Sequence, residues 1–121
     1  MRKRVLALGL DPALVDFSQT PGLTPALVAA FIDQELDRLR AANYDVVSCL
    51  VDFGATADAV TAAALGASRF DCVLIGAGLR AAPHLLLFER LLNLIHAQAP
   101  QAKICFNTTP VDSTEAVRRW V

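Results

Sequence analysis

Four short apolar runs recur along the chain, and each stops at a polar residue or a glycine. The runs are residues 5–10, 46–51, 72–75 and 104–106. The residues that end them are Asp11, Asp52, Gly76 and Asn107. None of the runs alternates cleanly between apolar and polar positions, and strands that are apolar on both faces are typical of a parallel sheet covered by helices on both sides. The pattern therefore predicts four buried parallel strands.

Helices are predicted between these runs. Thr24 and Pro25 supply a cap and a proline at the first helical position, and an apolar repeat with steps of three and four follows, so we expect a helix to about Ala42. The charged residues of this segment are assigned to its opposite, polar side; they are Asp33, Glu35, Asp37, Arg38 and Arg40. Three further helices are expected, from Thr56 to about Ala67, from Pro83 to before Pro100, and from the capping-box sequence at Asp112 to Trp120.

Strand and helix alternate four times, which is the pattern of a doubly wound α/β domain. We expect residues 1–121 to form one domain of three layers, with the strand order 2-1-3-4 that right-handed crossovers favour, as in flavodoxin-like and Rossmann-like folds. The segment from Asp11 to Leu23 contains Leu14, Val15 and Phe17 and is too apolar for a bare loop. It is predicted to be a lid or a short helical turn over one end of the sheet.

Composition narrows the classes of function. The chain has 121 residues, 55% of them hydrophobic and 19% charged, and a net charge of −1, so it has no general attraction to nucleic acid or to an anionic membrane. No run approaches the roughly 20 apolar residues that cross a bilayer, and no signal peptide is visible. The three cysteines fall inside predicted strands, without a CxxC motif, so we expect buried, reduced thiols and a cytoplasmic protein.

A ligand site is expected beyond the carboxyl ends of the strands, at the point where the winding of a doubly wound sheet reverses. For the predicted strand order this crevice lies between the first and third strands. The segment from Gly76 to Ala81 lies there and fits the dinucleotide pattern G-x-G-x-x-(G/A). The fit is incomplete, because the motif follows the third strand, Pro83 delays the helix, and the next strand ends at Asn107 instead of an acidic residue.

Three interpretations of this glycine motif stay open. It is a tight turn without a ligand, a dinucleotide site, or a site for a small anion such as phosphate or carboxylate. In the third interpretation, backbone N–H groups and the guanidinium of Arg80 hold the anion. The candidate ligand-binding residues are Gly76, Gly78, Arg80, Asp11 and Asn107.

Candidate catalytic residues are few. Asp11 and His84 lie at the predicted crevice or its rim and are the candidates for an acid or a base. In one hypothesis Asp11 binds a metal together with Asp52, and in the other both carboxylates cap turns or helix starts. The sequence has no cysteine and histidine spacing typical of zinc and no serine in a G-x-S-x-G elbow. No metal site is predicted, and whether the protein is an enzyme stays open.

The third predicted helix, from Pro83 to Gln98, is apolar over more of its circumference than one face of a sheet requires. The surplus is buried either within the monomer or against a second copy, and we favour a homodimer through this helix. Two hypotheses for function follow. The first is a small-molecule or anion-binding protein, with or without enzyme activity, and the second is a non-catalytic dimeric interaction module.

Two resemblances accompany these predictions. The winding resembles that of response-regulator receiver domains, but Gly76 stands where their phosphate-accepting aspartate ends the third strand, so phosphorelay chemistry is not expected. Nearly the whole chain also resembles a set of small uncharacterised bacterial and fungal single-domain α/β proteins. The similar segments are residues 8–12, 75–80, 86–89 and 106–108. That resemblance implies a fold and no particular activity.

Overall fold

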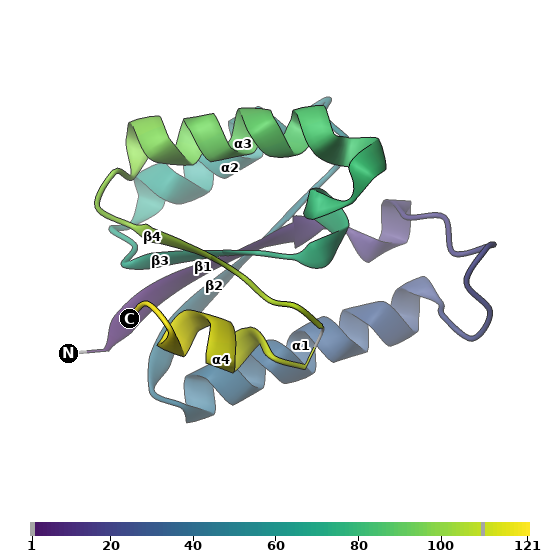
Figure 1. Ribbon diagram of the computed structural model, residues 1–121, viewed down its shortest axis with the longest axis horizontal. Coiled ribbons are helices and arrows are strands. Elements are labelled where there is room, and N and C mark those ends of the chain that lie inside the picture. Colours follow the sequence, from purple (N-terminus) through teal and green to yellow (C-terminus); the bar gives the residue numbers. More distant parts are fainter. Residues whose placement is uncertain (1, 110) are drawn as a thin grey trace.

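The computed structural model describes residues 2–109 and 111–121 and contains a four-stranded sheet in which all neighbouring strands are parallel (Figure 1). The strands are β1 (Lys3–Leu10), β2 (Tyr44–Val51), β3 (Cys72–Ile75) and β4 (Lys103–Phe106). Their order is β2-β1-β3-β4, which confirms the predicted flavodoxin-like winding. The central strand β1 pairs with β2 over its full length and with β3 from Val5 to Leu8.

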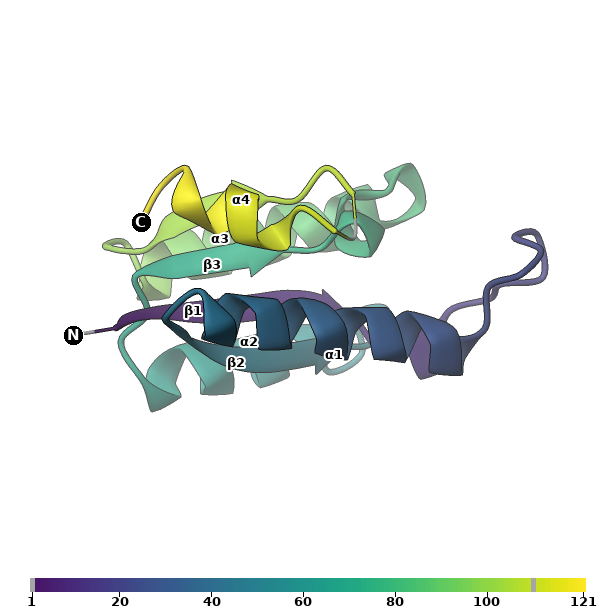
Figure 2. The ribbon, with the colours of Figure 1, turned by 90° about the horizontal axis from the view of Figure 1, so that it is seen from below.

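Helices cover both faces of the sheet, so the three predicted layers are present. The described residues form four α-helices, α1 (Pro25–Ala41), α2 (Ala57–Ala67), α3 (Leu85–Gln98) and α4 (Ser113–Arg118). Three 3-10 turns join them to the sheet, η1 (Pro12–Leu14), η2 (Ala77–Arg80) and η3 (Ala82–His84). Helices α2 and α3 lie on one face, and α1 and α4 lie on the other (Figures 1 and 2). Helix α3 starts two residues later than predicted because Pro83 lies in η3.

Local hydrogen bonds confirm one predicted helix cap and contradict two others. The hydroxyl oxygen of Thr24 accepts the N–H of Leu27 at 3.1 Å, as expected for the start of α1. Thr56 makes no side-chain cap for α2 and donates its hydroxyl to Asp52 instead, at 2.8 Å. The carboxylate of Asp112 also turns away from its own helix α4, since it accepts the N–H groups of Thr108 and Thr109. It therefore closes the loop that follows β4.

The two faces of the sheet carry side chains of different size. On the face toward α2 and α3, the strands present large residues; they include Leu6, Leu8, Val51, Val73 and Ile75, and they form the larger hydrophobic core. A smaller core on the opposite face joins Val5, Leu39 and Val117 near the amino ends of the strands. Further along that same face, β1 presents Ala7 and Gly9, and β2 presents Ser48 beside the larger Leu50. Small side chains there leave space between the sheet and α1.

The segment between β1 and α1 begins with the 3-10 turn η1, which confirms the predicted short helical turn. It then extends beyond the carboxyl ends of the strands before it returns to α1 (Figures 1 and 2). Val15 and Phe17 of this segment are half-buried, whereas Leu14 is largely exposed. The segment thus packs at the end of the sheet where a ligand site was predicted.

Helix α3 has more apolar surface than it packs against the sheet, and the exposed part lies in its first turn. Leu87, Leu91 and Ile95 are buried against the sheet. Leu85 and Leu86, in its first turn, are 58% and 70% exposed. The surplus is therefore concentrated at the start of the helix. Among the described residues, no helix is long and apolar enough to cross a membrane.

Candidate functional site

A cavity of about 480 Å³ lies between α1 and the sheet, at the carboxyl end of the strands. Its volume is within the range of roughly 300–1,000 Å³ that is usual for small-molecule sites. The cavity reaches the predicted crevice between the loops after β1 and β3, because Pro12, Gly76 and Gly78 are among its lining residues. Its location thus agrees with the one expected from the winding of the sheet.

The walls of the cavity are largely apolar. The sheet contributes the small residues Ala7, Gly9 and Ser48, together with the larger Leu50 and Leu74, and Gly76 follows directly after β3. Helix α1 and the segment before it contribute large residues, among them Val15, Phe17, Val28, Phe31 and Ile32. Phe31 is still 39% exposed, although its helix packs on the sheet further along at the fully buried Leu39. The first half of α1 therefore stands away from the sheet, and the second half closes against it.

Five polar side chains interrupt this apolar lining; they are Glu35, Ser48, His84, Asn107 and Ser113. Among the described residues that line the cavity, Glu35 is the only aspartate, glutamate, lysine or arginine. A site lined this way favours a ligand with an apolar body and few polar groups.

Glu35 was predicted on the polar side of α1, and this prediction is wrong. Its position is three residues from Ile32 and four from both Phe31 and Leu39, so it shares the inward face of the helix with them. The residue is 8% exposed. Its Oε2 accepts the guanidinium of Arg38 at 3.1 Å, while its Oε1 has no hydrogen-bond partner within residues 2–109 and 111–121. The spacing of the apolar residues contained this information, but the charge of the residue led to the opposite assignment.

Arg80, the predicted anion ligand, is directed at the ends of two strands. Its Nη1 donates to the carbonyl oxygen of Ile75 at 2.9 Å and to Oδ1 of Asn107 at 3.3 Å. Its Nη2 donates to the carbonyl oxygen of Asn107, and the guanidinium lies 4.9 Å from the centre of the Phe106 ring. Burial lowers the pKa of the guanidinium. Arg80 does not line the cavity, so its contacts join β3 to β4.

The glycine motif adopts ordinary backbone geometry. Gly76 has φ −70°, and in the described part of the chain only Gly22 and Gly54 among the glycines have positive φ. A methyl group on Gly76 would meet the carbonyl oxygen of Leu8 at 3.6 Å, an ordinary contact distance. The N–H of Gly76 donates to Leu8, and that of Leu79 donates to Gly76. These two N–H groups are thus already used within the protein.

The two aspartates that follow β1 and β2 cap turns, as one of the two hypotheses predicted. Oδ1 of Asp11 accepts the N–H of Ala13 at 3.0 Å. Oδ1 of Asp52 accepts the N–H of Gly54 at 3.0 Å, and its carboxylate also accepts the N–H and hydroxyl of Thr56. These hydrogen bonds hold the pKa of Asp52 below its ordinary value, and the one from Gly54 has the largest effect. Within the described residues, no group of three or more histidine, cysteine, aspartate or glutamate side chains is arranged to hold a metal ion.

His84 lies at the rim of the cavity, immediately before α3. Its ring stacks on Phe53 with 5.0 Å between centroids and an angle of 30° between planes. Phe53 comes from the loop after β2, so this stack joins two loops at the carboxyl end of the sheet. Sequence reasoning singled out His84 and overlooked Phe53, because nothing in the local pattern pairs two loops that are distant in sequence.

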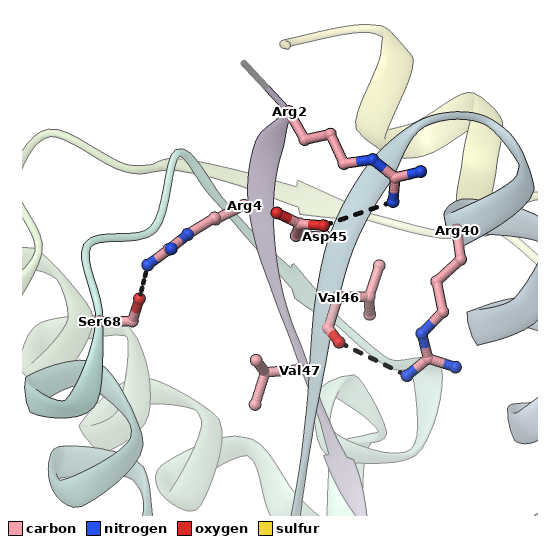
Figure 3. Close-up of a pocket in the computed structure, with 7 residues that line it drawn as sticks. All are labelled: Arg2, Arg4, Arg40, Asp45, Val46, Val47 and Ser68. Atoms are coloured by element: carbon pink, nitrogen blue, oxygen red, sulfur yellow. Dashed lines mark hydrogen bonds and ion pairs between the residues drawn. The ribbon is translucent and has the colours of Figure 1, made fainter.

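A second hollow of about 490 Å³ lies over the edge strand β2, near the amino ends of the strands (Figure 3). Three arginines line it, but each has its own partner. Arg2 pairs with Asp45 at 3.3 Å, Arg4 donates to the hydroxyl of Ser68, and Arg40 donates to the carbonyl oxygen of Val46 at 3.5 Å. Figure 3 shows Arg4 and Arg40 on opposite sides of the two strands, with the guanidinium of Arg40 turned toward Val46. The three guanidinium groups do not converge on one position, so the cavity under α1 is the stronger candidate.

Comparison with known proteins adds no family to this description. No protein-family model matches the chain, and a search of curated proteins gives no match. The chemistry of the site is therefore derived from its own residues.

Proposed function

We propose that this protein binds a small molecule with an apolar body in the cavity between α1 and the sheet. The observation that carries the proposal is the space that remains between helix α1 and the sheet. Phe31 and Ile32 of α1 line one side of it, Ala7 and Gly9 lie on the other side beside Leu50 and Leu74, and the volume is about 480 Å³. Exposed apolar surface of this extent costs free energy in water, and a ligand that covers it recovers that cost.

The position of the cavity supports the same proposal. In doubly wound sheets, ligands bind at the carboxyl end, where the winding reverses. Pro12 follows β1 and Gly76 follows β3, the two strands that flank this reversal, and both line the cavity. The candidate residues Gly78, His84 and Asn107 line it as well. The proposal covers binding and assigns no reaction.

An anionic ligand has less support than an uncharged or cationic one. A phosphate or carboxylate buried in an apolar site needs cationic or N–H partners. The described lining residues include no lysine or arginine, and Arg80 uses its guanidinium on Ile75 and Asn107. The anion site at Gly76 to Arg80 remains a prediction, because the guanidinium of Arg80 is already hydrogen-bonded to Ile75 and Asn107.

A cavity-filling substitution tests the proposal. Ala7 lies in the floor of the cavity, opposite Ser48 of β2 and Leu74 of β3. Ala7→Leu is expected to fill part of the volume and to weaken the binding of short-chain alkanols, followed by chemical shifts of cavity residues in an amide NMR spectrum. Ala67→Leu is the matched control, because Ala67 is exposed at the end of α2. If alkanols shift no cavity resonance in the unchanged protein, the proposal fails.

The exposed start of α3 supports a second candidate, a homodimer that acts as an interaction module. Leu85 and Leu86 are adjacent and largely exposed, and Phe53 nearby in the stack with His84 is 47% exposed. Light scattering of the Leu85→Glu and Leu86→Glu double variant tests this candidate. A dimer that becomes a monomer supports it, and a monomer of the unchanged protein at micromolar concentration rejects it. The three buried cysteines support the accompanying proposal of a reducing, cytoplasmic location.

A further inference from the structure

We infer that the ligand of this cavity carries a protonated amine on its apolar body, and that Glu35 accepts a hydrogen bond from that amine. The inference rests on the proposed binding function and names the chemical class of the ligand. It starts from a buried carboxylate that the fold leaves only partly hydrogen-bonded. Glu35 lies on the inward face of α1 between Ile32 and Leu39, where an apolar side chain would pack at no electrostatic cost.

The carboxylate of Glu35 is only partly compensated within the protein. Its Oε2 accepts Nη1 of Arg38 at 3.1 Å, but the Arg38 side chain is 48% exposed. Ion pairs with so exposed a partner contribute little. Its Oε1 has no partner among the described residues, although the residue is more than nine-tenths buried. Buried polar atoms without a partner are rare in folded proteins because they have lost hydration and gained nothing in return.

The surroundings of Glu35 select the charge of the partner. Of the described lining residues, Glu35 alone is an aspartate, glutamate, lysine or arginine, so the cavity has one acidic group in a wall that is mostly apolar. A cationic donor gains attraction there, a neutral donor gains a hydrogen bond only, and an anion is repelled. A ligand with a protonated amine and an alkyl or aryl body therefore fits the site, because its amine donates to the carboxylate and its apolar body contacts Phe31 and Ile32.

Glu35 also has a structural contact, and the test must separate it from ligand recognition. Nη1 of Arg38 donates to Glu35 and, at 3.1 Å, to the carbonyl oxygen of Val111, which leads into α4. A purely structural role for Glu35 predicts a change in stability when it is replaced. It does not predict any dependence of ligand affinity on the head group of the ligand.

The experiment compares three probes of equal chain length at pH 7, below their micelle concentrations: octan-1-amine, octan-1-ol and octanoate. Affinity is measured by calorimetry and by amide NMR shifts. We expect the amine to bind about tenfold or more tightly than the alcohol, and octanoate to bind least. Glu35→Gln should remove the preference for the amine and leave the affinity of the alcohol unchanged. Glu89→Gln is the matched control, because Glu89 is exposed on α3 and lies outside the cavity.

The outcomes separate this inference from the proposed function. If none of the three probes binds, the proposed function fails and the inference fails with it. If all three bind equally, or if Glu35→Gln leaves the preference for the amine intact, the cavity is a binding site but Glu35 does not select its ligand. Should Glu35→Gln fail to fold, the order of the three head groups on the unchanged protein decides the question.

Discussion

Arg80 and Asn107 join the carboxyl ends of β3 and β4 through one guanidinium group. Nη1 of Arg80 donates to Oδ1 of Asn107 at 3.3 Å, and Nη2 donates to the carbonyl oxygen of the same residue. The amide nitrogen of Asn107 in turn donates to the hydroxyl of Ser113 at 3.3 Å. The chain of contacts runs from the η2 turn through the end of β4 to the start of α4. It holds one end of the cavity together without placing a cation in it.

We expect Arg80→Ala to destabilise the protein by about 1–2 kcal/mol. The variant loses hydrogen bonds from a charged donor and leaves the carbonyl oxygens of Ile75 and Asn107 without it. The expected loss is small because Arg80 is only half-buried, and contacts that solvent reaches contribute less to stability. Urea denaturation followed by circular dichroism measures the effect. Arg69→Ala is the control, because Arg69 is exposed and no side-chain bond joins it to the described residues. Equal stability of the two variants would show that the contacts of Arg80 between the ends of β3 and β4 do not stabilise the protein.

Two apolar residues of α1 are expected to differ in their cost on truncation. Leu39 is fully buried, and Leu39→Ala should cost about 2–5 kcal/mol because it opens a cavity in the smaller core. Phe31 is larger but 39% exposed above the cavity, and Phe31→Ala should cost less than about 1.5 kcal/mol. Phe31→Ala should nevertheless weaken ligand binding. Guanidinium denaturation compares the two variants, and a Phe31→Ala cost equal to that of Leu39→Ala would show that α1 packs closely along its whole length.

Stability is expected to fall in acid because of Asp52. Its hydrogen bonds from Gly54 and Thr56 lower its pKa in the folded protein, so its carboxylate binds protons less readily when folded than when unfolded. This contribution is fully present above the ordinary pKa of 3.8 and is lost as the pH falls through the lower folded value. Asp52→Asn should therefore be less stable than the unchanged protein at pH 7, and the difference should shrink below about pH 4. Asp33→Asn, at an exposed position of α1, is the matched control. Thermal melts across this pH range make the comparison.

The cysteine thiols are expected to resist modification in the folded protein. Cys72 and Cys105 lie on the neighbouring strands β3 and β4 with 3.3 Å between their Sγ atoms, and both are buried. The hydrogen bond to Cys105 and burial raise the pKa of Cys72 far above its ordinary value, and burial raises that of Cys49. A disulfide reagent such as dithionitrobenzoate should react slowly at pH 8 and release all three equivalents only after urea is added. Fast reaction of the native protein would contradict this burial.

The order of the strands and α-helices, and their bounds to within about two residues, were predictable from the sequence. The apolar runs mark β1 to β4, and Thr24 with Pro25 marks the start of α1 within one residue. The winding 2-1-3-4 follows because parallel strands need right-handed crossovers. The capping role of Asp11 is also local, since its partner Ala13 is two residues away. Each of these features depends on neighbours in sequence or on a general rule of chain connection.

The role of Arg80 was not predictable in the same way. A cation beside two glycines is compatible with an anion site, and the sequence does not show that the carbonyl oxygen of Asn107 lies beside it. Arg80 and Asn107 are 27 residues apart in the sequence, and they meet only because β4 pairs with β3. The existence of the crevice could be inferred from the winding, whereas the partners of its side chains could not.

The sequence by itself determined the four strands, the four helices and the end of the sheet at which a site belongs, because periodicity and caps act over a few residues. It also contained the small residues Ala7 and Gly9 at alternate positions of β1, between larger ones. Only the tertiary structure decided that these residues lie under the first half of α1 and that a cavity remains between them. The physical reason is that the width of a gap between a helix and a sheet depends on side chains from distant segments packing together, and no local pattern fixes that packing.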